Sequence, residues 1–246
     1  MKYLVNVADS YGGDEVEYNE NYGYMLHQKY NFELINLWKP GTSNEGIIRV
    51  TVDWLLENQD KLNNTLFLIG FTSPVRKEWS INLSNFPNAT PDLFGKQGNK
   101  TVVHQSKRTG YIYVDSLIGA PPLCSKSMEK EYILKFLNSN SDYSKFIRRV
   151  FLLQSLFTLY GAKFLFYSIF ETSIINFEDY SYIDKDNWIL PESSFDGYLN
   201  KFPKKRVRVN SKHTNMQGKH PNKNGHEMWF KIISEKIETR INGWRR

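Results

Sequence analysis

The sequence is nearly free of cysteine: Cys124 is the only one among 246 residues. A single cysteine cannot form an internal disulfide and leaves no group of thiolates to bind zinc. Disulfide-stapled scaffolds and cysteine-rich zinc modules are therefore excluded. The pattern fits a reducing compartment or a small virion component.

Long apolar runs are also absent. The most hydrophobic stretch, residues 151–170, is interrupted by Gln154 and by the Gly-Ala-Lys at 161–163, so each piece is shorter than the ~20 residues that span a bilayer. After Lys2, the N-terminal run "YLVNV" is shorter than the ~7–15 apolar residues of a signal-peptide core. We expect no membrane association and no secretion through a signal peptide.

Patterns that bind phosphates or metals are missing as well. The glycines do not occur at phosphate-loop spacing, and His27, His104 and His213 have no partner at metal-ligand spacing. We expect no cofactor and no metal. The net charge of +6 gathers partly at residues 204–208 and at the C-terminal "WRR". A solvated lysine-rich face explains such clusters more often than nucleic-acid binding, which is not favoured.

What is present is an alternation of strands and helices. Apolar, β-prone runs at 2–7, 32–38, 65–71 and 162–170 predict strands, and helical periodicity predicts helices at 22–30, 45–58, 142–161 and 221–241. Asp142 is a candidate N-cap and Gly161 a candidate helix stop. The alternation predicts an α/β fold, a three-layer α/β/α sandwich with a mostly parallel, flavodoxin-like sheet of four to five strands.

The chain is expected to form a single domain over 1–246. Between residues 73 and 129 the pattern becomes irregular, with repeated proline, glycine and asparagine and one β-prone piece, "GYIYVDSLIG". A stretch of this length predicts an insertion or lid within the domain.

Polar loops follow the first three strands, where the working groups of a parallel sheet lie. They hold Asp9 and Ser10, residues 41–44, and residues 72–76. A serine hydroxyl needs a base within hydrogen-bond reach to become a nucleophile. His220, at a loop before the last helix, is the candidate base, whereas His226 inside that helix is expected to be a packed core residue.

Four short blocks, "ADSYGGDE", "NLWKPGTSN", "LIGFTSPVR" and "HPNKNGHEMW", together resemble the SGNH (GDSL-type) hydrolases, and more closely the SGNH-like proteins of tailed phages. The resemblance implies an esterase with Ser10 as nucleophile and His220 as general base. It also implies an oxyanion hole formed by the N–H groups of Ser10 and Gly41, with Thr72 as a third donor. The implied substrate is a small ester or an acylated carbohydrate, and the implied location is the cytoplasm of an infected bacterial host or the virion.

The sequence departs from the family pattern at two functional positions. Thr72 stands where the family has an asparagine that donates to the oxyanion. Gln217 stands where the family has an aspartate, three residues before the histidine. Glutamine can orient an imidazole, but it cannot offset the charge of an imidazolium.

Other polar residues near these blocks are expected to support the site or bind substrate. Asp9 is expected to fix its own loop through backbone N–H groups, and Asn44 belongs to the second block. Arg76 and Glu78 are candidates for binding an anionic substrate group or for supporting His220, and a surface ion pair between them is the alternative.

Two other functions remain open at this point. The first is a catalytically weak or inactive scaffold that serves as a phage accessory or virion binding protein. The second is an acyltransferase that uses the same Ser-His pair. The second alternative needs water to be excluded, which residues 73–129 would do as a lid.

Overall fold

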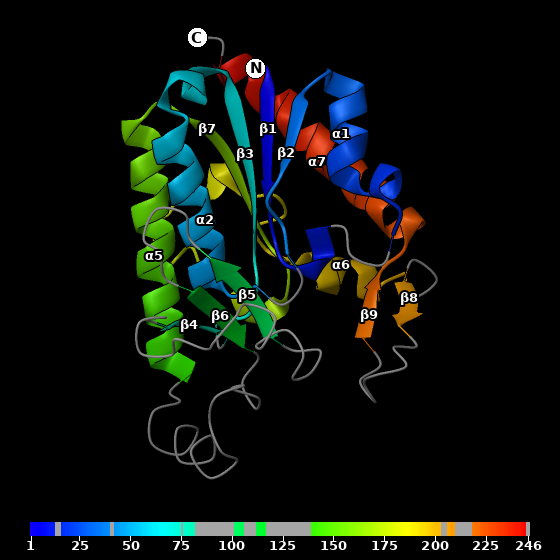
Figure 1. Ribbon diagram of the computed structural model, residues 1–246. Helices are drawn as coiled ribbons and strands as arrows, with labels where there is room; N and C mark the ends of the chain where they lie inside the picture. Colours follow the sequence, from blue (N-terminus) through cyan, green and yellow to red (C-terminus); the bar gives the residue numbers. More distant parts are fainter. Residues whose placement is uncertain are drawn as a thin grey trace.

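A four-stranded parallel sheet forms the centre of the computed structural model, which describes residues 1–12, 16–39, 42–74, 76–81, 101–105, 112–116, 139–202, 206–209 and 218–244. Its strands are β1 (Tyr3–Val7), β2 (Glu33–Asn36), β3 (Thr65–Phe71) and β7 (Lys163–Ser168). They pair in the order β2-β1-β3-β7, and every pairing is parallel (Figure 1). This is the flavodoxin-like order, so the predicted fold class is confirmed.

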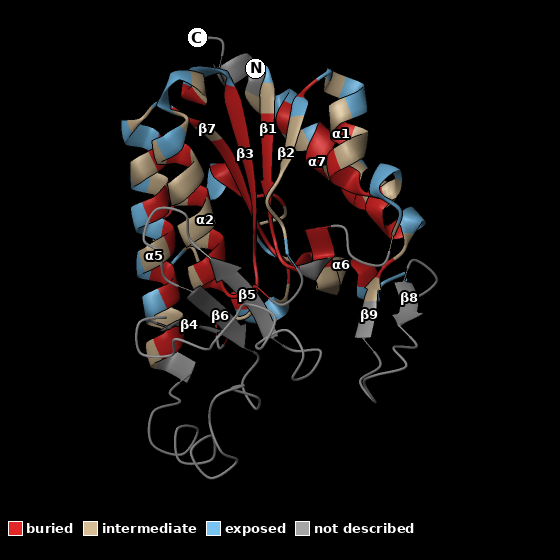
Figure 2. Cartoon of the chain, in the orientation of Figure 1, coloured by how far each residue is buried: buried red, intermediate tan, exposed pale blue. Residues whose placement is uncertain are grey.

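Helices cover both faces of the sheet. The helices α2 (Asn44–Glu57) and α5 (Ser139–Leu159) lie on one face, and α1 (Tyr22–Tyr30) and α7 (Lys223–Trp244) lie on the other (Figure 1). Parallel strands enclosed in this way are buried on both faces, which explains the continuous apolar run of β3. All seven residues of that strand are buried (Figure 2).

Alternate side chains of each strand enter two separate cores. In β3, Phe67 and Ile69 point into the core shared with α2 and α5, and Leu66 and Leu68 point into the core shared with α1 and α7. The sheet thus lies between two apolar layers. Polar loops can therefore follow its strands only at the strand ends.

The helix boundaries follow from local capping. Ser43 precedes α2, and its side chain accepts a hydrogen bond from the Gly46 N–H at 3.2 Å. Gly161 has a φ of +65° just after α5, as a helix stop requires. The prediction that Asp142 caps α5 is wrong, because the helix begins at Ser139 and Asp142 lies inside its first turn. An acidic residue is also favoured there by the helix dipole.

Three further elements surround the carboxyl ends of the main strands. They are an antiparallel sheet of β4 (Lys77–Ile81), β6 (Ile112–Ser116) and β5 (Thr101–Gln105), the hairpin of β8 (Arg206–Val209) and β9 (Gly218–Pro221), and the short helix α6 (Phe195–Asn200). The antiparallel sheet lies within residues 73–129, and the remainder of that segment falls mostly outside the described residues. Its role as a lid stays a prediction. Within the described ranges, no helix has the length and apolarity needed to cross a membrane.

Candidate active site

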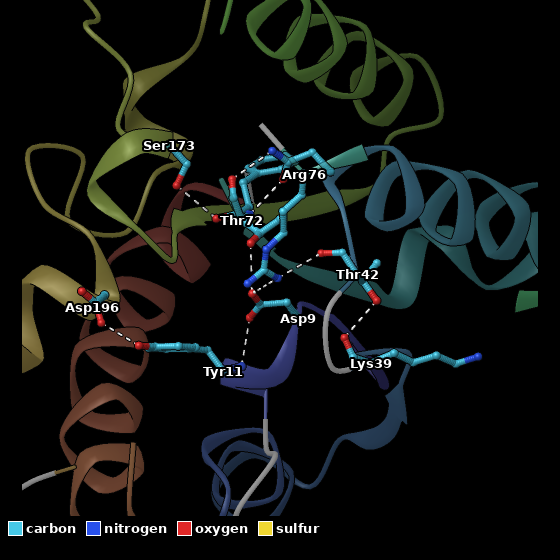
Figure 3. Close-up of polar contacts among 10 residues, drawn as sticks. Asp9, Tyr11, Lys39, Thr42, Thr72, Arg76, Ser173 and Asp196 are labelled. Carbon is cyan, nitrogen blue, oxygen red and sulfur yellow. Dashed lines mark hydrogen bonds and ion pairs between the residues drawn. The ribbon is translucent and has the colours of Figure 1, made fainter. Parts of the chain in front are cut away.

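The loops that follow β1, β2 and β3 meet at one edge of the sheet. Asp9 comes after β1, residues 42–44 after β2, and residues 72–76 after β3. Figure 3 shows the side chains of Thr72 and Arg76 reaching the Asp9 carboxylate, with the main chain of Thr42 beside Arg76. The structure therefore brings together three of the four sequence blocks at the edge where the sequence predicted them.

Asp9 is completely buried and is the centre of this cluster. Its Oδ1 accepts a hydrogen bond from the Tyr11 N–H at 2.9 Å. Its Oδ2 accepts two more, from the Thr72 hydroxyl at 3.0 Å and from Arg76 Nη1 at 2.8 Å (Figure 3). A buried carboxylate is tolerated only when charged or polar hydrogen-bond donors replace its lost hydration. The three donors to Asp9 fill this role. Asp9 fixes its own loop, as expected, and also ties that loop to the one after β3.

Arg76 forms a buried ion pair with Asp9. Its side chain is only 11% exposed, and Nη1 also lies 3.5 Å from the Thr42 carbonyl oxygen. The guanidinium carbon lies 5.4 Å from the centre of the Phe170 ring, within range of a cation–π interaction. The sequence suggested either a ligand for anions, a partner of His220 or a surface pair with Glu78. The structure shows a buried contact of Arg76 with the loop of the proposed nucleophile. The three suggested roles stay predictions.

Asn44 joins the loops after β2 and β3. Its side-chain amide donates to the Thr72 carbonyl oxygen at 2.9 Å, and its side-chain oxygen accepts from the Thr72 N–H, also at 2.9 Å. This pair of bonds reproduces the pattern of two paired backbone amides, and Asn44 is 2% exposed. Asn44 therefore supports the site from inside the protein.

The Thr72 hydroxyl, expected to be an oxyanion donor, is engaged with Asp9. A hydroxyl has one hydrogen to donate, and Thr72 is fully buried. Donation to an oxyanion therefore requires this hydroxyl to rotate away from the Asp9 carboxylate. In the observed arrangement Thr72 helps to hold the Asp9 loop.

The proposed nucleophile, Ser10, opens a 3₁₀ turn that runs from Ser10 to Gly12, between two anchored neighbours. Asp9 is held as described, and the turn closes with a bond from the Gly12 N–H to the Asp9 carbonyl at 2.9 Å. A Cβ at Gly12 would lie 2.6 Å from Trp38 side-chain atoms, so only glycine fits there. The side chain of Ser10, together with Gly41 and Gln217, lies outside the described residues.

His220, the proposed base, lies on β9 and is half-buried beside this turn. The centres of the His220 and Tyr11 rings are 5.5 Å apart, and the rings are inclined by 60°. Because Tyr11 directly follows Ser10, the turn of the proposed nucleophile and the strand of the proposed base meet through this aromatic contact. The fourth sequence block thus reaches the same edge of the sheet.

His226 is a core residue, as the sequence predicted. It is fully buried, stacked on Tyr22 at 5.6 Å, and neither ring nitrogen has a hydrogen-bond partner among the described residues. Burial, with a smaller contribution from the charge of His220, lowers the pKa of His226 from 6.5 to about 3. The imidazole of His226 is therefore neutral at physiological pH.

Two residues at this edge were missed by the sequence analysis. The Tyr11 hydroxyl donates to Asp196 Oδ1 at 2.6 Å, across 185 positions of the chain (Figure 3). Tyr11 stands beside Ser10 in the first block, but an aromatic residue there gives no sign of its partner. Asp196 lies on α6, outside every block, and no local pattern identifies it. In the described part of the chain, no group of three or more histidine, cysteine or acidic side chains is arranged to hold a metal.

Comparison with known proteins finds similarity in structure alone. No protein-family model matches the chain, and no curated protein matches it in sequence. The psychrotrophic esterase EstA from Pseudoalteromonas sp. is similar in structure, with a TM-score of 0.51 and 12% identity over 98% of this chain and 100% of that one.

Two further solved structures align along nearly their whole length. TesA gives a TM-score of 0.46 and 10% identity over 97% of this chain and 99% of that one. A member of the lipolytic protein G-D-S-L family from Veillonella parvula DSM 2008 gives 0.45 and 12%, over 97% of each chain. The similarity that carries weight is that to EstA, and it concerns the fold: this chain has the same α/β architecture over the full length of both proteins.

Proposed function

We propose that the protein is a serine hydrolase of the SGNH (GDSL) type that cleaves an ester. The observation that supports this best is the meeting of Ser10's turn with His220's strand through the Tyr11 ring. The fold similarity to an esterase agrees with the proposal. The substrate class, a small ester or an acylated carbohydrate, rests on the family resemblance, as does a location in the host cytoplasm or the virion.

The proposed reaction begins with attack of Ser10 Oγ on the ester carbonyl carbon while His220 accepts the hydroxyl proton. The main-chain N–H groups of Ser10 and Gly41 donate to the oxyanion, each contributing about 3–4 kcal/mol. The intermediate collapses, His220 returns the proton to the leaving alcohol, and Ser10 holds the acyl group. Water, deprotonated by His220, then releases the acid and restores the hydroxyl of Ser10.

The cluster around Asp9 supplies the preorganisation for this reaction. A nucleophile works only when it is held within a narrow range of positions. Ser10 lies between Asp9 and Tyr11. The buried Asp9 carboxylate accepts a hydrogen bond from the Tyr11 N–H, which fixes the main chain on both sides of Ser10. Arg76 and Thr72 keep the Asp9 carboxylate from turning away.

A fluorophosphonate probe, which reacts with activated serines, tests the proposal. Wild type should label and should hydrolyse p-nitrophenyl acetate, whereas Ser10→Ala should do neither and His220→Ala should lose at least about a thousandfold in rate. Ser155→Ala removes an exposed hydroxyl on α5 and is the matched control, expected to behave as wild type. Labelling of Ser10→Ala at the wild-type rate would exclude the proposed nucleophile. A folded wild type without labelling would favour the scaffold alternative.

A further inference from the structure

Tyr11 is held by two carboxylates, one bonded to its main chain and one bonded to the hydroxyl at the end of its ring. Its main-chain N–H donates to Asp9, and its hydroxyl donates to Asp196 at 2.6 Å. Hydrogen bonds to charged acceptors are about twice as strong as neutral ones. Tyr11 is also only 4% exposed. The ring therefore has one defined position beside Ser10.

Asp196 is itself anchored to the central sheet. Its main-chain N–H donates to the Ile169 carbonyl oxygen at 2.8 Å, just beyond the end of β7. Its other carboxylate oxygen accepts from the Asn200 side chain at 3.3 Å. The carboxylate is thus held in place from two sides and acts as a fixed acceptor for the Tyr11 hydroxyl.

His220 rests against the ring that Asp196 holds. The two ring centres are 5.5 Å apart, and Phe170 and Phe195 contact the same Tyr11 ring at 5.2 and 5.6 Å. Tyr11 thus contacts three rings at once, and one of them is the imidazole of His220. A contact chain therefore runs from the Asp196 carboxylate through Tyr11 to the His220 imidazole.

From this geometry we infer that Asp196 positions His220 through Tyr11, in place of the aspartate that the sequence lacks at Gln217. The inference rests on the proposed function, in which His220 is the general base. When His220 takes the proton of Ser10 it becomes a cation 5.5 Å from an aromatic ring, within the range of a cation–π interaction. Donation of the Tyr11 hydroxyl to a carboxylate makes that ring richer in electrons. Asp196 and Tyr11 are positioning residues, and they act as one unit.

Kinetics of Asp196→Asn and Tyr11→Phe test the inference. Each variant should lower kcat about three- to thirtyfold and change KM less than about twofold, the range expected for loss of a cation–π contact in the transition state. The double variant should be no slower than the slower single one. Tyr11→Phe keeps the ring and its aromatic neighbours, so it guards against a folding defect.

A measurement that does not depend on activity separates this inference from the proposed function. The ring protons of His220, assigned by comparison with His220→Gln, should shift in the ¹H–¹³C spectrum of Asp196→Asn because the Tyr11 ring is released. Asp179→Asn, a change at a surface aspartate bonded to Asn176, is the matched control and should leave them in place. Unchanged His220 signals in Asp196→Asn, or rate losses that multiply in the double variant, overturn the inference. Shifted signals in a protein that the fluorophosphonate does not label support the positioning and reject the hydrolase.

Discussion

At the scale of the residue, Asp9 shows how a buried charge can organise a site. Three donors reach its two oxygens, and they come from the loops after β1 and β3. Only Arg76 among them carries a full positive charge. The ion pair therefore offsets most of the cost of burying the carboxylate, and removal of one partner leaves the other uncompensated.

Replacement of Arg76 by methionine should accordingly lower the free energy of unfolding by about 3–5 kcal/mol, because it leaves Asp9 as an unpaired buried charge. Combining Arg76→Met with Asp9→Asn removes that charge, so the double variant should be more stable than the sum of the two single changes indicates. Urea denaturation of all four proteins measures this coupling. Strictly additive losses would mean that the two side chains do not interact in solution.

At the scale of the element, the loops after β2 and β3 are joined by a side chain, Asn44, that forms hydrogen bonds as a main-chain amide would. Asn44 begins α2 and makes two hydrogen bonds of 2.9 Å with the main chain of Thr72, beyond the end of β3. The main chain of the loop after β3 thereby gains hydrogen bonds from a side chain, in addition to those within the parallel sheet. Helix α2 and strand β3 are locked at the edge where the site lies.

Asn44→Ala leaves the buried N–H and carbonyl of Thr72 without partners, so it should destabilise the protein by about 2–4 kcal/mol. Under the proposed function it should also slow ester hydrolysis, because Thr72 holds the Asp9 loop. Asn63→Ala, at an exposed asparagine before β3, is the matched control and should change stability by less than about 0.5 kcal/mol. Thermal unfolding gives the comparison. Equal stability of the two variants would show that the reciprocal bonds contribute nothing.

Elements were predictable where a local pattern determines them, and contacts were not. The apolar run of β3 indicates a buried parallel strand, and the structure confirms it. The functional role of the polar loop after that strand stays a prediction. The ion pair of Arg76 with Asp9 spans 67 positions, and the bond of Tyr11 to Asp196 spans 185. Such pairs depend on which loops the folded sheet brings together. No periodicity or spacing within a single sequence carries that information.

At the scale of the whole molecule, the core under α7 contains a titratable group that has no polar partner within the described part of the chain. His226 is fully buried between the Tyr22 and Phe195 rings, and its pKa is lowered to about 3 by burial. In the unfolded chain the imidazole takes up a proton near pH 6.5, whereas in the folded protein it does so only near pH 3. The unfolded state therefore binds more protons between these values, and stability falls as the pH falls.

This difference in pKa predicts that His226 makes the whole protein sensitive to acid. Below pH 6.5 it should cost about 1.4 kcal/mol of stability per pH unit, or about 4–5 kcal/mol in total by pH 3. His226→Phe and His226→Met have no proton to gain, so their advantage over wild type should grow by that amount as the pH is lowered from 7 to 3. Urea titrations at several pH values measure the difference in stability between each variant and wild type. The contributions of the carboxylates cancel in this difference, because all three proteins share them. If the phenylalanine or methionine side chain packs poorly, the stability of that variant is lowered by the same amount at every pH. The slope of its stability against pH is then unchanged. Curves that stay parallel to wild type over this range would show that His226 is protonated inside the folded protein.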